Sequence, residues 1–501
     1  MNNRGKYFLL ILFCFIKVCL LAQTTFNKTV DFSNGDESGS CILKQDDGYI
    51  LIGAGWGFET GDYFDQKLKF AKTDLEGNVI WTNFIGESSI NLFCGAQAGI
   101  IAQDGNIVFC GSRLNAATYA IILVKFNPLT GDTIFYKKFD FDDELKGIQV
   151  KELSDGNLII LGVDENDSYG SLLIKTSADG DLIWQKRYGT ATENSSTDFA
   201  IYSDTLYLVN RYFMCSPEGY FIRKIDDEGN VIQTLTFDEG CASNGFLSNQ
   251  GGYYGVGAYF PVPPYQTYIY RTNLSGIMEW HYNTAFDLDT LIYEDLFPEI
   301  IRELPNGDII VAGYFASNYL GTYFGLVSKI NMDGTPYWER IYTASTDVYE
   351  DSRLVDMQIV GDGEIALIGS GYGESTIEDQ NFWILKLDSV GCLIPGCDTL
   401  DDAILELPVD NSGIIVYPNP VEYEAIIEIS ISQSEVINGS LYLRITTIDG
   451  KIITDDQVKN FNMNGNKYSF PFHRHNLPSG LYIIQVFNTT RLLGTSKILL
   501  K

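Results

Sequence analysis

The sequence predicts an all-β protein in which a seven-bladed β-propeller is followed by a small C-terminal β-sandwich. Three observations support this fold class: a glycine-bounded apolar motif recurs, a basic residue follows each copy, and the composition suits short strands. Of 501 residues, 45% are hydrophobic, 13% are aromatic and 48 are glycine. Aromatic side chains favour strands and glycine favours tight turns, so many short strands are expected.

The recurring motif is a glycine followed by an apolar run that ends in a second glycine. Residues 105–111 (GNIVFCG) and 307–313 (GDIIVAG) are clear copies, and residues 204–210 form a degenerate one. Copies begin roughly 50 residues apart, which fits a propeller blade and exceeds most helical repeats. The seven copies begin at Gly48, Gly105, Gly156, Asp204, Gly252, Gly307 and Gly363.

Each copy is followed by a basic residue, a small polar residue and a turn glycine. The basic residues are Lys72, Lys125, Lys175, Lys224, Arg271, Lys329 and Lys386. Each unit yields four strands, and an Asp or Asn side chain caps the turn before the fourth while glycine accepts positive φ. Fourth-strand aromatic residues favour packing between blades; they are Trp81, Phe135, Trp184, Trp280 and Trp338.

The seventh unit lacks a fourth strand, because Gly391 is followed at once by Cys392-Leu-Ile-Pro395. Residues 26–32 align with the fourth-strand segment of the first unit. We therefore expect this N-terminal segment to pair into the last blade and close the ring, covering a sheet edge that would otherwise invite aggregation. The propeller is assigned to residues 23–397.

Residues 1–22 have the pattern of a cleaved signal peptide. An apolar run follows Arg4 and Lys6, ends at Ala22 and is interrupted by Lys17. Because a transmembrane helix needs about 20 apolar residues, we expect cleavage near Ala22 and no membrane span in the mature chain.

Charge is strongly unbalanced, with 34 Lys and Arg residues against 65 Asp and Glu residues and a formal net charge of −31. Repulsion from phosphates argues against nucleic acid and anionic lipid as partners. An acidic surface is usually a solubility adaptation, and cation binding is the alternative. No metal site or other cofactor is predicted, but calcium stays open at residues 140–144 and 164–167, neither of which has EF-hand spacing.

Cys392 and Cys397 are the disulfide candidate among nine cysteines. They flank Pro395 and Gly396, and such a close pair suits an oxidising compartment. An odd number of cysteines follows the signal peptide, so at least one free thiol is expected unless it pairs between molecules.

After an acidic linker at residues 398–412, residues 413–501 contain four short motifs. In order they are Tyr417-Pro418-Asn419-Pro420, Ile448-Asp449-Gly450-Lys451, Leu477-Pro-Ser-Gly480-Leu481-Tyr482 and Lys497-Ile-Leu-Leu-Lys501. With these motifs the tail resembles the type A C-terminal sorting domain of the type IX secretion system. The preceding repeats also resemble those of secreted propellers that carry this tail.

The resemblance implies a β-sandwich that is recognised by the outer-membrane translocon. It also implies passage through the periplasm to a secreted or cell-surface location, with the mature protein released or tethered. The positions that carry the sorting signal under this resemblance are Tyr417, Pro418, Asn419, Pro420, Asp449, Gly450, Gly480, Tyr482 and Lys501.

The loops after the second and fourth strands vary in length and share one face of a propeller. Loops on a rigid scaffold often carry function, so we predict a glycan or protein ligand on this face. The alternative is that these side chains only fold over the rim. The ligand-binding candidates are Trp56, Phe58, Asp62, Tyr63, Tyr119, Tyr169, Tyr212, Tyr259, Tyr265, Tyr314, Tyr319, Tyr372 and Glu374.

Catalytic motifs are scarce, and the three histidines are His281, His473 and His475. The sequence has no HExxH, no G-x-S-x-G elbow and no phosphate-cradling glycine motif, so we predict a binding module and not an enzyme. A carboxylate-dependent glycan-active enzyme stays open, because acids are abundant and their separation is invisible in sequence. A non-catalytic adhesion or structural component is the other alternative.

Overall fold

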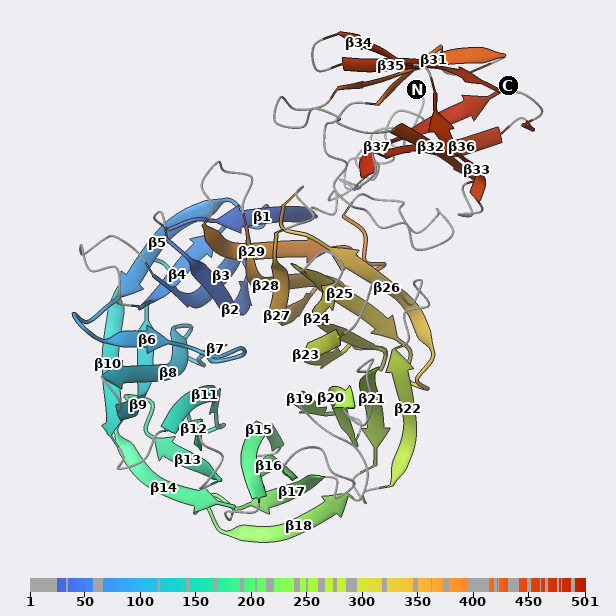
Figure 1. Ribbon diagram of the computed structural model, residues 1–501. Helices are drawn as coiled ribbons and strands as arrows, with labels where there is room; N and C mark the ends of the chain where they lie inside the picture. The colour runs from blue at the N-terminus through green and yellow to red at the C-terminus, as the bar shows by residue number, and fades with distance from the viewer. Residues whose placement is uncertain are drawn as a thin grey trace, which may run out of the picture.

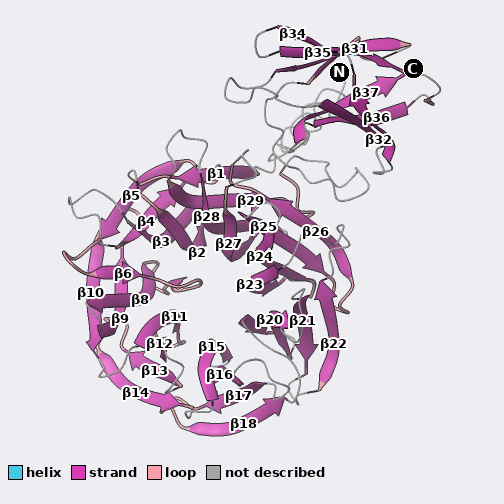
Figure 2. Ribbon diagram, viewed as in Figure 1, coloured by secondary structure: helices cyan, strands magenta, loops and turns pink. Residues whose placement is uncertain are grey.

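All the regular elements in the described part of the protein are strands. The structure is a computed structural model, shown in Figures 1 and 2. The predicted signal peptide and the linker at 398–412 lie outside the described residues. The structure describes residues 25–32, 35–56, 66–115, 118–140, 145–164, 170–189, 193–202, 205–212, 220–237, 244–248, 251–259, 266–273, 277–284, 295–317, 322–345, 350–361, 363–372, 379–393, 414–418, 421, 423–430, 441–447, 452–459, 461–464, 467–474, 477–478, 480–487 and 492–501.

The first three sheets follow one another along the chain, and all their pairings are antiparallel. Sheet 1 contains β2 (Glu37–Gln45), β3 (Gly48–Gly55), β4 (Lys67–Thr73) and β5 (Val79–Ile85). Sheet 2 contains β6 (Asn91–Phe93), β7 (Gly99–Ile101), β8 (Ile107–Asn115), β9 (Thr118–Phe126) and β10 (Thr133–Asp140). Sheet 3 contains β11 (Leu145–Glu152), β12 (Leu158–Asp164), β13 (Ser171–Thr176) and β14 (Leu182–Tyr188).

Four further sheets complete the ring drawn in Figure 1. Sheet 4 contains β15 (Glu193–Tyr202), β16 (Thr205–Tyr212), β17 (Tyr220–Ile225) and β18 (Val231–Phe237). Sheet 5 contains β19 (Asn244–Leu247), β20 (Tyr253–Tyr259), β21 (Gln266–Thr272) and β22 (Met278–Thr284). Sheet 6 contains β23 (Asp295–Glu303), β24 (Ile309–Ser317), β25 (Thr322–Ile330) and β26 (Pro336–Tyr342), and sheet 7 contains β27 (Ser352–Val360), β28 (Glu364–Tyr372), β29 (Gln380–Leu387) and β1 (Phe26–Val30).

Sheet 7 joins the two ends of the repeat region. Its strand order is β1-β29-β28-β27, and the register runs from Phe26 opposite Lys386 to Val30 opposite Phe382. The side chain of Asn27 accepts a hydrogen bond from Trp383 Nε1 at 2.6 Å and donates one to Thr343 O at 2.8 Å. The N-terminal strand is therefore tied to both sheet 7 and sheet 6.

Neighbouring sheets are joined by an aromatic ring that lies on a turn glycine. In six sheets the fourth-strand aromatic is the cross-strand partner of the repeated basic residue, whereas Gln233 faces Lys224 in sheet 4. A Cβ atom added to Gly334 would lie 2.9 Å from the Trp280 ring of the preceding sheet. The other ring and glycine pairs are Phe26 with Gly77, Trp81 with Gly131, Phe135 with Gly180, Trp184 with Gly229 and Trp338 with Gly391.

The repeated basic side chains are largely buried and form ion pairs near the tight turns. Lys72 Nζ lies 2.7 Å from Asp47 Oδ2, Lys125 Nζ lies 2.7 Å from Asp104 Oδ2, and Lys386 Nζ lies 2.9 Å from Glu364 Oε2. Asp47 and Asp104 lie in the turn between the first two strands of the same sheet, and Glu364 is the first residue of the second strand. The motif therefore links two tight turns of one sheet.

Sheet 2 differs from the expected four strands, because its innermost strand is divided into β6 and β7, which both pair with β8. Gln97 lies between them with φ 59°, a left-handed conformation that interrupts a strand. Its side chain accepts a hydrogen bond from Arg302 Nη2 of sheet 6 at 2.9 Å. The interruption thus places a sheet 2 segment against a sheet on another side of the ring.

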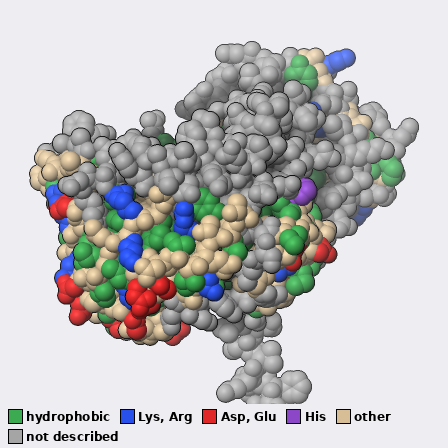
Figure 3. Space-filling model, turned by 90° about the horizontal axis from the view of Figure 1, so that it is seen from below, with side chains coloured by type: hydrophobic (Ala, Val, Ile, Leu, Met, Phe, Trp, Pro, Cys, Tyr) green, Lys and Arg blue, Asp and Glu red, His purple; other side chains and the backbone are tan. Residues whose placement is uncertain are grey.

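The outer strands expose single aliphatic side chains, including Ile80, Ile134, Leu182 and Ile232. Figure 3 shows hydrophobic, basic and acidic side chains close together on one side of the molecule, with acidic side chains gathered toward one edge. Scattered exposed aliphatic residues are normal on folded proteins and do not indicate a partner.

The C-terminal residues form two four-stranded sheets that share one apolar core. One sheet has the order β30-β31-β35-β34 and the other β33-β32-β36-β37. Their side chains meet in a cluster that includes Ile427, Phe470, Ile484 and Ile498. The strands are β30 (Ile415–Tyr417), β31 (Glu424–Ser430), β32 (Leu441–Thr447), β33 (Ile452–Val458), β34 (Asn462–Asn464), β35 (Lys467–His473), β36 (Gly480–Phe487) and β37 (Leu492–Leu500).

The described cysteines include one in a disulfide and three with free thiols. Cys392 is disulfide-bonded, and its predicted partner Cys397 lies outside the described residues. Cys41, Cys94 and Cys110 are free. Burial raises the pKa of the Cys94 thiol to about 12, so this group stays protonated at neutral pH.

Candidate functional site

Successive strands of each sheet run in opposite directions, so their connections lie alternately on two opposite faces of the ring. The turns after the first and third strands of each sheet are short and lie on one face, the tight-turn face. The loops after the second and fourth strands lie on the opposite face, here called the variable-loop face. Contacts that recur from sheet to sheet lie on the tight-turn face. Residues that differ from sheet to sheet lie mainly on the variable-loop face.

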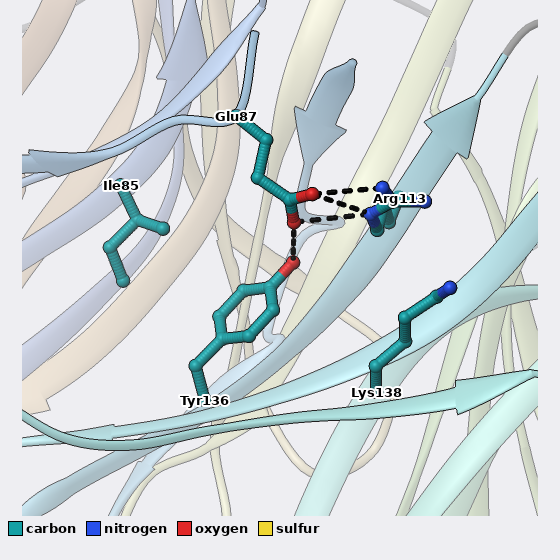
Figure 4. A pocket seen from close by; sticks show the side chains of 5 residues that line it. All are labelled: Ile85, Glu87, Arg113, Tyr136 and Lys138. Carbon is teal, nitrogen blue, oxygen red and sulfur yellow. Dashed lines mark hydrogen bonds and ion pairs between the residues drawn. The ribbon is translucent and has the colours of Figure 1, made fainter.

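A surface pocket of about 400 Å³ opens toward the variable-loop face between sheets 1 and 2. Figure 4 shows its five lining side chains. Ile85 ends β5, Glu87 follows it in the loop, Arg113 lies near the end of β8, and Tyr136 and Lys138 come from β10. Three strands and one loop therefore build the pocket.

Glu87 is the centre of the hydrogen-bond network in this pocket. Arg113 Nε donates to Glu87 Oε2 at 2.9 Å and Arg113 Nη2 donates to the same oxygen at 2.8 Å. The Tyr136 hydroxyl donates to Glu87 Oε1 at 2.7 Å. The hydrogen bond from Arg113 holds the pKa of Glu87 below its usual range, and Glu87 in turn raises the pKa of Arg113, so both stay charged.

A second cluster on the variable-loop face contains the predicted candidate Tyr314. Its ring stacks on Phe297 with centroids 5.0 Å apart, and Tyr323 meets it edge-on at 5.5 Å. The Arg353 guanidinium lies 3.8 Å from the centroid of Tyr323. Burial raises the pKa of the adjacent Glu299, which also interacts with Tyr314 and Arg353.

Three other predicted candidates have described side chains. Tyr119 packs edge-on against Phe93 at 5.9 Å, and Lys146 Nζ lies 5.1 Å from its ring centroid. Trp56 is 37% exposed, and half-buried Tyr372 ends β28. Tyr119 and Tyr314 belong to sheets 2 and 6 on different sides of the ring, so the structure does not bring these candidates into one site (Figure 1).

The remaining ligand-binding candidates cannot be placed. Tyr212 and Tyr259 end β16 and β20, and their side chains lie outside the described part of the structure. The others, all outside the described residues, are Phe58, Asp62, Tyr63, Tyr169, Tyr265, Tyr319 and Glu374.

The sequence interpretation did not select the residues that line the pocket. Arg113 lies two residues after the second copy of the glycine motif, and Glu87 follows Gly86 in a loop after a fourth strand. Their positions at strand ends that face the variable loops are the sequence signal that could have pointed to them.

Within the described ranges, no His, Cys, Asp or Glu side chains form a group of three that could hold a metal ion. The calcium alternatives at 140–144 and 164–167 fall mostly outside those ranges. In the same residues, no helix is long and apolar enough to cross a membrane.

The sorting-signal residues lie in the C-terminal sheets where they are described. Tyr417 ends the edge strand β30 and is exposed, as is Pro418, whereas Tyr482 in β36 is buried. Gly480 begins β36, and the Lys501 backbone N–H donates to Val421 O at 2.9 Å. Asn419, Pro420, Asp449 and Gly450 lie outside the described residues.

The C-terminal tail matches a known protein family. Residues 415–501 match the family described as the secretion system C-terminal sorting domain. The chain carries a type IX sorting tail. This confirms the resemblance predicted from the four motifs, and the sorting tail indicates export to the cell surface or secretion.

Solved β-propeller structures match the remainder of the chain. The Dos1 propeller is 8% identical with a TM-score of 0.43, covering 73% of this chain and 96% of its own. The β-propeller domain of the Trilobed protease from Pyrococcus furiosus is 11% identical with a TM-score of 0.39, covering 70% and 94%. The polysaccharide lyase Uly1 is 10% identical with a TM-score of 0.42, covering 70% and 90%.

These likenesses concern the fold alone, and no functional argument is based on them. No curated protein matches the chain. The all-β and propeller predictions are confirmed, whereas ligand and activity have to be argued from the site.

Proposed function

We propose that this protein is a secreted or cell-surface binding module, a seven-bladed β-propeller with a glycan or protein ligand on its variable-loop face. In this proposal sheets 1–7 are the blades, residues 23–397 form the propeller, and β1 closes the ring. Residues 1–22 are the signal peptide, residues 398–412 the linker, and residues 413–501 a sorting β-sandwich that engages the translocon after passage through the periplasm.

One observation carries the binding proposal: the two faces of the ring are built differently. The tight-turn face repeats one kind of ion pair in sheets 1, 2, 6 and 7 and one kind of ring contact at six turn glycines. The variable-loop face instead holds a polar pocket at Glu87 and an aromatic cluster at Tyr314, which recurs only in a smaller form at Tyr119, Phe93 and Lys146 among the described residues. Unrepeated polar and aromatic side chains on a rigid scaffold are typical of binding sites.

The test is a glycan-array, protein-ligand and polysaccharide-hydrolysis screen on the full mature chain. Binding without turnover is the expected result. Absence of any ligand would refute the binding module and leave the adhesion or structural role.

A glycan-active enzyme is the second candidate, because Glu299 is a half-buried carboxyl whose pKa is raised by desolvation. A raised pKa favours the protonated form that a general acid needs. Product formation that is lost in Glu299→Gln, while ligand binding persists, would establish this reading over the non-catalytic one.

The export part has a separate test. Removing residues 477–501 deletes β36 and β37, and we expect the shortened protein to accumulate in the periplasm. Because this deletion also removes core strands, Lys501→Ala provides a milder variant, with Lys459→Ala, at another exposed lysine, as its control. Unchanged secretion of the shortened protein would contradict the role of the sorting tail.

A further inference from the structure

We propose that the pocket formed by Ile85, Glu87, Arg113, Tyr136 and Lys138, here called the Glu87 pocket, binds the carboxylate of an acidic saccharide such as a uronic acid residue. This inference rests on the proposed function and specifies a ligand class and a position on the variable-loop face.

The Glu87 pocket has more hydrogen-bond donors than its own acceptors use. Both oxygens of Glu87 are occupied, Oε1 by Tyr136 and Arg113 Nε and Oε2 by Arg113 Nε and Nη2. Arg113 therefore presents its second terminal nitrogen, Nη1, which has no hydrogen-bond partner among the described residues. A guanidinium carries five N–H donors in a planar fork that suits an oxyanion.

Lys138 supplies a second cation on the same wall. Its Nζ lies 2.7 Å from Asp140 Oδ1, and the two side chains are 36% and 68% exposed. A surface pair of this kind contributes little stability, and an ammonium has three donors, so Lys138 can bind a ligand oxygen while it stays near Asp140. The pocket thus offers spare donors on two cations, while its central carboxylate is already occupied.

The opposite side of the pocket is apolar. Ile85 lies on the side of Glu87 and Tyr136 that is away from Arg113 and Lys138, and the Tyr136 ring lies between Ile85 and Lys138 (Figure 4). A pyranose ring has a C–H face that packs on such side chains, while its substituents reach the polar wall. A volume of about 400 Å³ lies within the range of small-molecule sites and accommodates a single sugar ring with part of its neighbour.

Charge on the rest of the molecule does not prevent an anionic ligand from binding. The formal net charge is −31, but remote charges are screened beyond a Debye length of about 8 Å at physiological ionic strength. A contact between a carboxylate and Arg113 or Lys138 is a short, charge-assisted hydrogen bond that is screened much less. A neutral sugar would gain only the weaker hydroxyl contacts, so the pocket favours the acidic form.

The experiment measures binding by isothermal titration calorimetry with the full mature chain. The probes are oligomers of galacturonate, glucuronate, mannuronate and guluronate, each compared with its methyl ester, which keeps the ring and removes the charge. Poly-glutamate tests an acidic peptide as the ligand. Lys138→Gln is the variant, and Lys137→Gln is its matched control.

Lys137 is a close control because it is the adjacent residue of β10 with the same 36% exposure, and its Nζ pairs with Asp181 of sheet 3. We expect at least one uronate oligomer to bind, and Lys138→Gln or methyl esterification to weaken its binding about tenfold or more. Lys137→Gln should leave the affinity within about twofold.

Three results would overturn the inference: no uronate oligomer binds, binding ignores both esterification and Lys138→Gln, or poly-glutamate binds better with the same dependence on Lys138. In the second case a glycan still binds elsewhere, so the proposed function stands while the pocket assignment fails. If neither the array nor these probes yield any ligand, both fail.

Discussion

Gly334→Ala tests the contact by which each aromatic ring lies on the turn of the next sheet. Gly334 has φ 91°, a conformation that costs a residue with a Cβ atom roughly 1 to 2 kcal/mol. The new Cβ would also lie 2.9 Å from Trp280 Cε3. The Trp280 ring cannot move away easily, because its Nε1 donates to Met332 O at 2.9 Å. Overpacking of this kind costs about 1 to 3 kcal/mol.

Gly105→Ala is the matched control. Gly105 has a similar φ of 81°, but a Cβ atom there would meet nothing within 4 Å. Urea unfolding of the mature chain, followed by tryptophan fluorescence, should therefore show a loss of about 1 to 2 kcal/mol for Gly105→Ala and about 2 to 5 kcal/mol for Gly334→Ala. Equal losses in the two variants would refute the packing role of the ring.

Three further predictions concern a buried acid, the closing strand and the thiols. Burial raises the pKa of Glu37 to about 7, against an ordinary value of 4.5, so folding takes up a proton and the resulting stability is lost as the pH rises through 7. Glu37 pairs with Lys69 Nζ at 2.6 Å, and both side chains are fully buried, so the reference is the double variant Glu37→Gln, Lys69→Met. Between pH 5 and pH 8 the wild type should lose roughly 2 to 3 kcal/mol relative to this reference in urea unfolding, and a constant difference would contradict the prediction. Asn27→Ala removes the acceptor of Trp383 Nε1, so thermal unfolding should show a loss of about 1 to 3 kcal/mol, whereas Lys28→Gln, which removes only solvent-exposed hydrogen bonds, should lose less than about 1 kcal/mol. Alkylation of the denatured, unreduced protein should label Cys41, Cys94 and Cys110 but not Cys392 in mass spectrometry, and labelled Cys392 would count against its disulfide.

The repeats made much of the fold predictable. The basic residue and the fourth-strand aromatic stay in cross-strand register, as with Lys72 and Trp81, so the sequence pattern follows the sheet geometry directly. The divided inner strand of sheet 2 was not predictable in this way. It depends on the left-handed conformation at Gln97 and on a hydrogen bond to Arg302, and a repeat pattern contains no information on either.

Fewer of the candidate-site residues could be predicted from the sequence, for a similar reason. Tyr314 was selected because aromatic residues stand out in loops, and the structure places it in an aromatic cluster. Glu87, Arg113 and Lys138 were missed because each alone resembles an ordinary surface charge. Only the meeting of two sheets brings them within hydrogen-bond reach of one another or into one pocket.

The ring-on-glycine contact also bears on how such a chain can grow by duplication. Sheets 1, 2, 3 and 6 each carry one ring for the sheet that follows and one glycine for the ring of the sheet before, whereas sheet 4 has Gln233 in place of the ring. A copied repeat therefore arrives with both halves of the interface, and insertion between two existing repeats restores the contact on each side without further substitution. The seam between β1 and β29 is different, because its two strands come from opposite ends of the repeat region, so added repeats are tolerated only inside that boundary.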